Sequence, residues 1–149
     1  MPSGQHHTAA TLSAAAIITY QSMAMLDGSL AVVALGCLCG LVLTPDLDVD
    51  AGSISIHHIR ETFGATAAWV WEEYWKLYAE NVSHRSWVSH FPSAGTMIRL
   101  AYFIPTWGIL WAMLAGYWWA WAWFGGLLLS DTLHAIMDVI WSAWKRLTS

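Results

Sequence analysis

Four long apolar runs, separated by short turns and one polar stretch, constrain the fold of this 149-residue chain more than any other feature. Apolar residues make up 57% of the sequence and charged residues only 11%, whereas charged residues make up about 25% of a typical globular domain. The chain also contains 12 tryptophans, and its mean hydropathy is +0.47. This composition predicts a small polytopic membrane protein that folds as one all-α domain over residues 1–149.

Each apolar run predicts one transmembrane helix of a four-helix bundle. The first run ends at Asp27-Gly28, which favours a turn, and the second ends at Pro45, which disfavours further helix. Pro105 predicts a kink in the third helix, and Gly125-Gly126 predicts a break or bend in the fourth. The fourth helix is longer than the membrane core, so we expect its end to protrude. The predicted spans cover residues 9–26, 30–44, 96–115 and 118–144.

The polar loop between the second and third spans covers residues 46–95. We expect residues 54–59 to be irregular and His57 and His58 to be solvated. Residues 66–82 mix Trp and Tyr with charged side chains, which predicts an amphipathic helix lying at the membrane interface. The alternative is a helix packed on its own domain.

Four spans place both termini and the polar loop on the same side of the membrane. All six Lys and Arg residues lie on or near that side, so the positive-inside rule predicts that it is cytoplasmic. The sequence has no basic patch that would suggest binding to nucleic acid. The expected partners are membrane lipid and, through exposed Trp-rich faces, another membrane subunit.

Clusters of carboxylates and imidazoles are the candidate functional residues, and the predicted topology brings them to that one side. Such groups are costly at membrane depth unless they hold an ion or take part in chemistry. The sequence therefore predicts a shared metal site. The candidate ligands are one of His6 and His7, together with Asp46, Asp48, His84, His90, Asp131, His134 and Asp138.

Spacing within the clusters supports this prediction. Asp46 and Asp48 would point the same way in an extended segment, where two carboxylates repel unless a cation lies between them. The alternative is a solvated acidic turn or a helix cap. Asp131, His134 and Asp138 fall within about 60° of one another on a helix, although a polar packing face between helices would use the same spacing.

The loop that carries His84 and His90 also carries Arg85. Neutral imidazole is the commonest transition-metal ligand. Arg85 would pair with a phosphate or with a carboxylate near the metal, and its alternative is a surface ion pair.

The number of candidate ligands exceeds the need of one four-coordinate ion. It predicts two divalent ions about 3.5–4 Å apart, with Zn as the first expectation and Mn or Fe as alternatives. A hydrolase acting on phosphoester or lipid-like substrates would use water activated by the metals, Asp48 or Asp131 as the general base, and Arg85 to hold an anionic group. A non-catalytic protein in which the ions hold short helices together, and a pigment- or haem-binding subunit, are the alternatives.

Four motifs in this order carry a resemblance that covers nearly the whole chain. They are Pro-Ser-Gly-x-x-His, Pro-Asp-Leu-Asp, His-Arg-Ser-x-x-Ser-His and Asp-x-x-His-x-x-x-Asp. The chain resembles a bacterial family of uncharacterised membrane metal-binding proteins, related to inner-membrane metal-dependent hydrolases and remotely to zinc-dependent phospholipase C. The resemblance implies a bacterial inner-membrane location and His7 as the N-terminal ligand. The chain lacks the N-terminal Trp of the soluble phospholipases, which weakens any transfer of their substrate.

Overall fold

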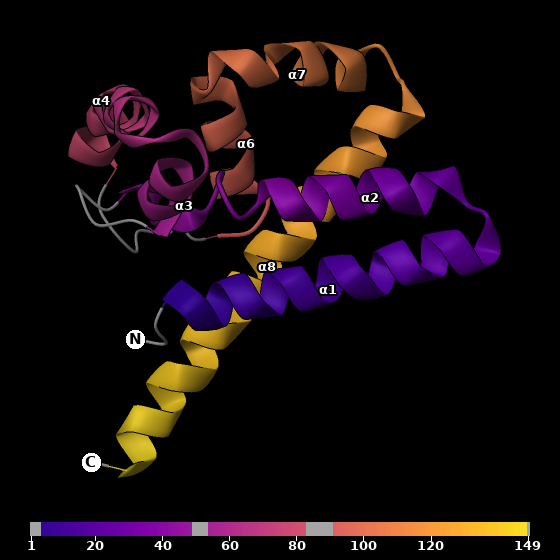
Figure 1. Cartoon of the computed structure of the whole chain (residues 1–149). Coiled ribbons are helices and arrows are strands. Elements are labelled where there is room, and N and C mark those ends of the chain that lie inside the picture. Colours follow the sequence, from indigo (N-terminus) through magenta and orange to yellow (C-terminus); the bar gives the residue numbers. More distant parts are fainter. Residues whose placement is uncertain (1–3, 49–53, 83–90, 149) are drawn as a thin grey trace.

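A computed structural model describes residues 4–48, 54–82 and 91–148, and all regular structure in these ranges is helical. The α-helices are α1 (Gly4–Met25), α2 (Gly28–Cys39), α3 (Ile54–Phe63), α4 (Ala65–Asn81), α6 (Ala94–Tyr102), α7 (Trp107–Leu114) and α8 (Trp118–Thr148). Two 3-10 segments, η1 (Pro45–Asp48) and η2 (Ile104–Thr106), join them. The predicted all-α class is confirmed for these residues (Figure 1).

Helices α1 and α2 form an antiparallel hairpin (Figure 1). The predicted turn is confirmed, with Leu26 in the left-handed region at φ 52°. Asp27 caps α2, because its Oδ1 accepts hydrogen bonds from the backbone N–H and the hydroxyl of Ser29, at 2.8 and 2.6 Å. These bonds to Ser29 hold the pKa of Asp27 below its usual value. Helix α2 ends at Cys39, short of the predicted end at residue 44.

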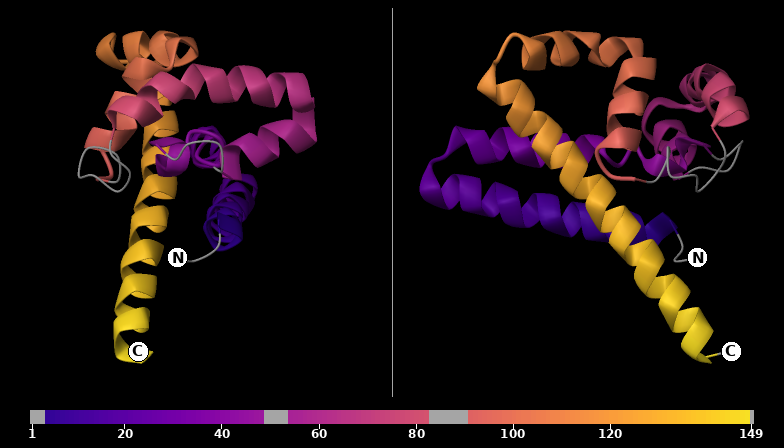
Figure 2. Two further views of the ribbon diagram at one scale, coloured as in Figure 1. Left: turned by 90° about the vertical axis from the view of Figure 1, so that its left-hand side faces the viewer. Right: turned by 180° about the vertical axis from the view of Figure 1, so that it is seen from behind.

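Helix α8 crosses the hairpin and packs mainly against α2 (Figures 1 and 2). Glycines permit the close approach: a Cβ added at Gly36 would lie 1.9 Å from the Trp123 carbonyl oxygen, and one at Gly126 would lie 1.9 Å from the Val33 carbonyl oxygen. Of the predicted break or bend at Gly125-Gly126, the break is wrong, because α8 is one helix of 31 residues. Gly126 therefore allows α2 to pack closely against α8, and it does not interrupt α8.

The third predicted span is not a single helix. Helices α6 and α7 are separated by η2, which contains Pro105, and the two parts meet at a bend of 105°. The chain thus bends at Pro105, where the kink is predicted, but the bend is much sharper than a kink within one transmembrane helix. Within the described residues, no helix alone combines the length and apolar character of a membrane span, although this bent pair passes that test jointly.

The polar loop contains more helix than expected. Residues 54–59, predicted to be irregular, belong to α3, whose Ile56 and Ile59 pack against Ala68 of α4. The helix predicted over residues 66–82 is present as α4, and one of its faces buries Trp75 and Tyr78 in the main core. That core also contains Leu43, Leu47, Leu100, Trp123 and Leu127.

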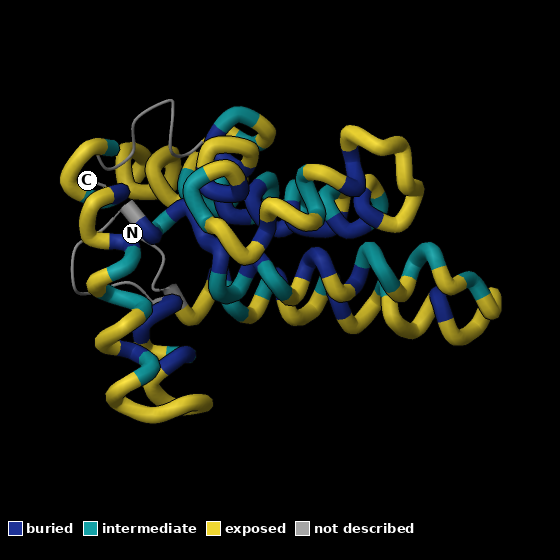
Figure 3. The backbone as a smooth tube through the Cα atoms, turned by 90° about the horizontal axis from the view of Figure 1, so that it is seen from above, coloured by how far each residue is buried: buried dark blue, intermediate teal, exposed yellow. Residues whose placement is uncertain are grey.

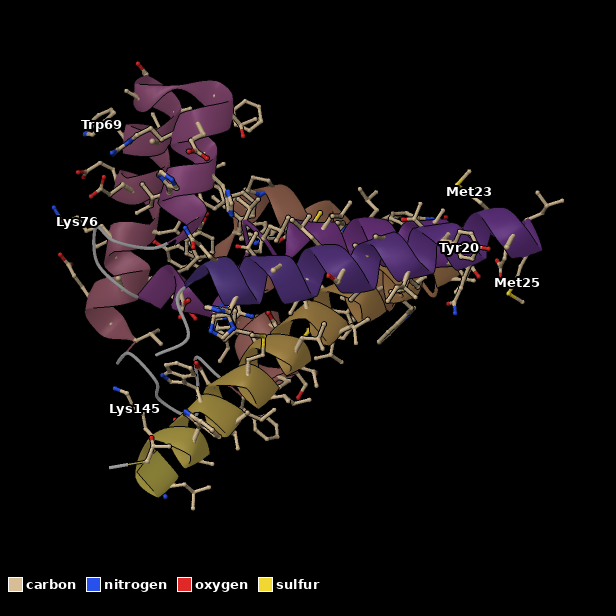
Figure 4. All side chains as sticks on the ribbon, turned by 60° about the horizontal axis from the view of Figure 1, so that its bottom comes forward. Tyr20, Met23, Met25, Trp69, Lys76 and Lys145 are labelled. Carbon is tan, nitrogen blue, oxygen red and sulfur yellow. The ribbon has the colours of Figure 1, made fainter. Side chains whose placement is uncertain are left out.

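Buried positions concentrate where the helices meet, and exposed positions dominate the ends that project from this junction (Figure 3). The far end of the hairpin exposes Tyr20, Met23 and Met25, while Trp69 and Lys76 point outward from α4 (Figure 4). The last turns of α8 project beyond the other helices (Figure 1). The start of α1 lies beside the middle of α8, which positions the site described next.

Candidate metal centre

Three segments meet at the junction of α1, η1 and α8. The first turns of α1 carry His7, η1 carries Asp46, and α8 carries His134 and Asp138. On α8 the last two are four residues apart, so their side chains lie on the same helix face. Pro45 begins η1 after α2 has ended, and η1 brings Asp46 next to His134 of α8.

Each of the four side chains lies close to at least one of the others. The Nε2 atom of His7 lies 3.4 Å from Oδ1 of Asp138. The Nε2 atom of His134 lies 3.5 Å from Oδ1 of Asp46 and 3.6 Å from Oδ2 of Asp138. One possible ligand atom from each of His7, His134 and Asp138 lies within 4.8 Å of the other two.

The separations fit a cation shared by His7, His134 and Asp138, with Asp46 next to His134. Zinc bonds of about 2.0–2.2 Å in a tetrahedron place neighbouring ligand atoms about 3.3–3.6 Å apart. All three measured N–O separations, 3.4, 3.5 and 3.6 Å, agree with that range. They exceed the usual length of an N–H···O hydrogen bond, which is about 2.7–3.2 Å. The mixed nitrogen and oxygen donors suit Zn, Mn or Fe.

The centre has a buried side and an accessible side. The side chains of His7 and His134 are 9% and 6% exposed, whereas those of Asp138 and Asp46 are 20% and 21% exposed. The imidazoles therefore close the centre from the interior, and the carboxylates border solvent. A bound ion would be reached from the carboxylate side.

Asp131 takes no part in these three contacts. Its Oδ2 atom accepts hydrogen bonds from the hydroxyl of Thr96 and from Nη2 of Arg99, both on α6. All three residues are at least 98% buried. Asp131 therefore forms an ion pair that fastens α6 to α8.

The remaining predicted residues have three different outcomes. His6 is exposed, so of the two neighbouring histidines it is His7 that lies in the centre. Asp48 belongs to η1 beside Asp46, but its side chain is not among those described. The predicted residues His84, Arg85 and His90 lie outside the described residues.

Sequence reasoning missed several polar partners. Arg99 and Thr96 were not identified, although an arginine within an apolar run signals a buried counter-charge. His58 was expected to be solvated, yet its Nε2 lies 3.3 Å from the Thr8 hydroxyl beside the centre. His57 is exposed and pairs with Glu61, in keeping with the expectation for that residue.

The comparisons with known proteins bear on metal binding. Neither a curated protein nor a solved structure matches the chain. The model of a family described as uncharacterised metal-binding proteins, DUF2227, matches residues 2–123. The matched residues include His7 and Asp46 and end before His134. Because the match spans more than half of the chain, the protein belongs to the DUF2227 family of uncharacterised metal-binding proteins.

Proposed function

We propose that this protein is a metal-dependent hydrolase that acts on phosphoester or lipid-like substrates. The observation that carries the proposal is the set of three N–O separations of 3.4–3.6 Å among His7, Asp46, His134 and Asp138. We assign these four residues as ligands of one divalent ion. When bound, such an ion polarises a phosphoryl or carbonyl oxygen and lowers the pKa of water.

The uneven burial of the centre supports catalysis. His7 and His134 shield the interior side from water, while the partly exposed Asp46 and Asp138 leave an approach for a substrate. We propose Asp48, two residues after Asp46, as the general base. Asp131 becomes a weaker candidate for that role than the sequence suggested, because Thr96 and Arg99 both bond to its Oδ2. We propose that Arg85 holds the anionic group of the substrate.

A second ion is part of the proposal. Asp48, His84 and His90 would supply its ligands next to the first ion, as expected for a two-metal site. Elemental mass spectrometry of purified protein tests the count. We expect about two ions per chain in the wild type. We expect about one after His84→Ala and His90→Ala together, and about one after His134→Ala, because each variant leaves the ligands of the other ion in place. Equal metal content in all three proteins would contradict the assignment.

A metal-stabilised structural protein is the second candidate. It is favoured by the fact that the four ligands come from three segments, so one ion would join α1, η1 and α8. Turnover of a chromogenic phosphodiester separates the two functions. The hydrolase predicts metal-dependent turnover that Asp48→Asn abolishes while the ion held by His7, His134 and Asp138 is kept. The structural role predicts thermal stabilisation by metal without turnover.

We also propose that the protein resides in a bacterial inner membrane with the metal centre on the cytoplasmic side. Exposed Tyr20, Met23 and Met25 at the far end of the hairpin support this placement (Figure 4). The 22 residues of α1 extend about 33 Å, close to the thickness of a hydrocarbon core of about 30 Å. Release of the protein from membranes by alkaline carbonate would contradict integral insertion.

A further inference from the structure

A small cavity of about 10 Å³ is lined in part by His7 and His134. Its walls come from α1, from the segment that joins α2 to η1, and from α8. His7, Thr11, Thr44 and Ser130 are among the residues that line it. A cavity of roughly this size holds a single water molecule if it offers two to four polar partners.

His7 supplies the first of these partners. Its Nε2 faces Asp138, whereas its Nδ1 is buried and has no hydrogen-bond partner among the described residues. A histidine that binds metal through one ring nitrogen almost always hydrogen-bonds through the other, and this second bond fixes the tautomer and the ring orientation. The buried Nδ1–H of His7 therefore needs a hydrogen-bond acceptor inside the protein.

Three buried hydroxyls supply the remaining partners. The Thr44 hydroxyl accepts a hydrogen bond from the backbone N–H of Asp46 at 3.4 Å. The proton of the Thr44 hydroxyl therefore remains available for a second hydrogen bond. The hydroxyls of Thr11 and Ser130 lie 3.1 Å apart and share one hydrogen bond. Their oxygens retain accepting capacity, since each hydroxyl has two lone pairs. The cavity is thus lined by both donors and acceptors.

We propose that this cavity is a binding site for one ordered water molecule that positions the metal ligand His7. The water accepts Nδ1–H of His7 and the hydroxyl proton of Thr44, and it donates to the oxygen of Ser130 or Thr11. This arrangement keeps the lone pair of Nε2 directed at the metal. Thr44 also contacts the backbone of Asp46, so the water links two ligand-bearing segments.

The proposal rests on the proposed metal centre, but its first test needs no metal. In the metal-free protein the Asp138 carboxylate, 3.4 Å from Nε2, favours the Nε2–H tautomer of His7, whereas the water favours the Nδ1–H tautomer. We therefore expect nitrogen-15 NMR spectra of the metal-free wild type to show both tautomers. Ser130→Ala removes one partner of the water without touching the Thr44–Asp46 contact, and we expect it to shift His7 toward the Nε2–H tautomer. An unchanged tautomer ratio in Ser130→Ala would overturn the proposal.

Metal affinity gives the second readout. We expect Ser130→Ala and Thr44→Val each to weaken zinc binding by about 10–100-fold, the usual cost of losing such an outer partner. Thr44→Ser keeps the hydroxyl and should bind like the wild type. Thr132→Val is the matched control, because that hydroxyl donates to the Leu128 carbonyl on α8 and does not line the cavity. Unchanged affinity in both test variants would contradict the inference.

The two proposals fail separately. If the wild type binds no metal but the tautomer ratio of His7 responds to Ser130→Ala, the water site stands and the metal centre is wrong. If the metal binds and the tautomer does not respond, the metal centre stands and the water site is wrong.

Discussion

The imidazole rings of His7 and His134 lie face to face, with their centroids 3.9 Å apart and their planes 16° from parallel. The two residues are separated by most of the chain, yet one begins α1 and the other lies in the middle of α8. Contact between them fixes the start of α1 on α8. Loss of either ring should therefore affect metal binding and the attachment of this helix together.

We predict that His7→Ala abolishes the stabilisation of the fold by metal. A ligand present at 100 times its dissociation constant stabilises a protein by about 2.7 kcal/mol, and the variant should lose most of this gain. Thermal unfolding with and without a chelator measures the effect. His6→Ala is the control, because that side chain is exposed on the neighbouring position. A larger loss in His6→Ala than in His7→Ala would reverse the assignment of the ligand.

The glycine pair of α8 offers a sharp test of the packing between α2 and α8. A Cβ at Gly126 would meet the backbone of Val33, whereas one at Gly125 would meet nothing within 4 Å. We predict that Gly126→Ala destabilises the protein by about 1–3 kcal/mol or more through overpacking. Gly125→Ala should be neutral or stabilise by about 0.5–1 kcal/mol, since alanine favours helix. Chemical denaturation of the two variants measures this difference in the free energy of unfolding. Similar free energies for Gly125→Ala and Gly126→Ala would contradict the close contact between α2 and α8.

Part of the candidate centre was predictable from sequence. Motif spacing placed His134 and Asp138 on one helix face, and the order of apolar runs brought His7 and Asp46 to the same side. Both inferences depend on local periodicity and on chain reversal at short turns. The structure brings possible ligand atoms of His7, His134 and Asp138 within 4.8 Å of one another, and Asp46 lies 3.5 Å from His134.

Other features depend on long-range packing, which local patterns do not encode. Gly126 has the same local signal whether it interrupts a helix or admits a neighbouring backbone, and only the position of α2 decides between them. The segment at Ile56 and Ile59 becomes helical where it packs on Ala68, despite its irregular appearance in the sequence. Arg99 reaches Asp131 only because α6 folds back on α8.

Two tyrosines hold α4 against the end of α6, and their hydrogen bonds are reciprocal. The Tyr74 hydroxyl donates to the Tyr102 carbonyl and the Tyr102 hydroxyl donates to the Tyr74 carbonyl, each at 2.7 Å. The Tyr74 hydroxyl also accepts the backbone N–H of Ile104 at 3.1 Å. We predict that Tyr102→Phe costs about 0.5–1.5 kcal/mol and that Tyr74→Phe costs more, because it removes two bonds. Urea denaturation gives the order, and a larger loss for Tyr102→Phe would contradict these contacts.

The ion pair between Arg99 and Asp131 allows its structural role to be separated from metal binding. Both side chains are 2% exposed, so Arg99→Leu leaves a buried carboxylate without its counter-charge. We predict a loss of about 3–5 kcal/mol in the free energy of unfolding for this single variant. Denaturation of the metal-free protein is the appropriate measurement, because a bound ion would add its own stabilisation.

The double variant Arg99→Met with Asp131→Leu supplies the decisive comparison. Replacing a whole buried ion pair by apolar residues is often neutral or stabilising, so we expect it to recover most of the stability lost by Arg99→Leu. If this recovered protein also binds metal like the wild type, Asp131 fastens α6 to α8 and is not a ligand. If it folds but binds metal at least about tenfold more weakly, a difference of about 1.4 kcal/mol, Asp131 acts on the metal centre as the sequence predicts. Failure of the double variant to regain stability would mean that Thr96 and other neighbours of the pair require its charge.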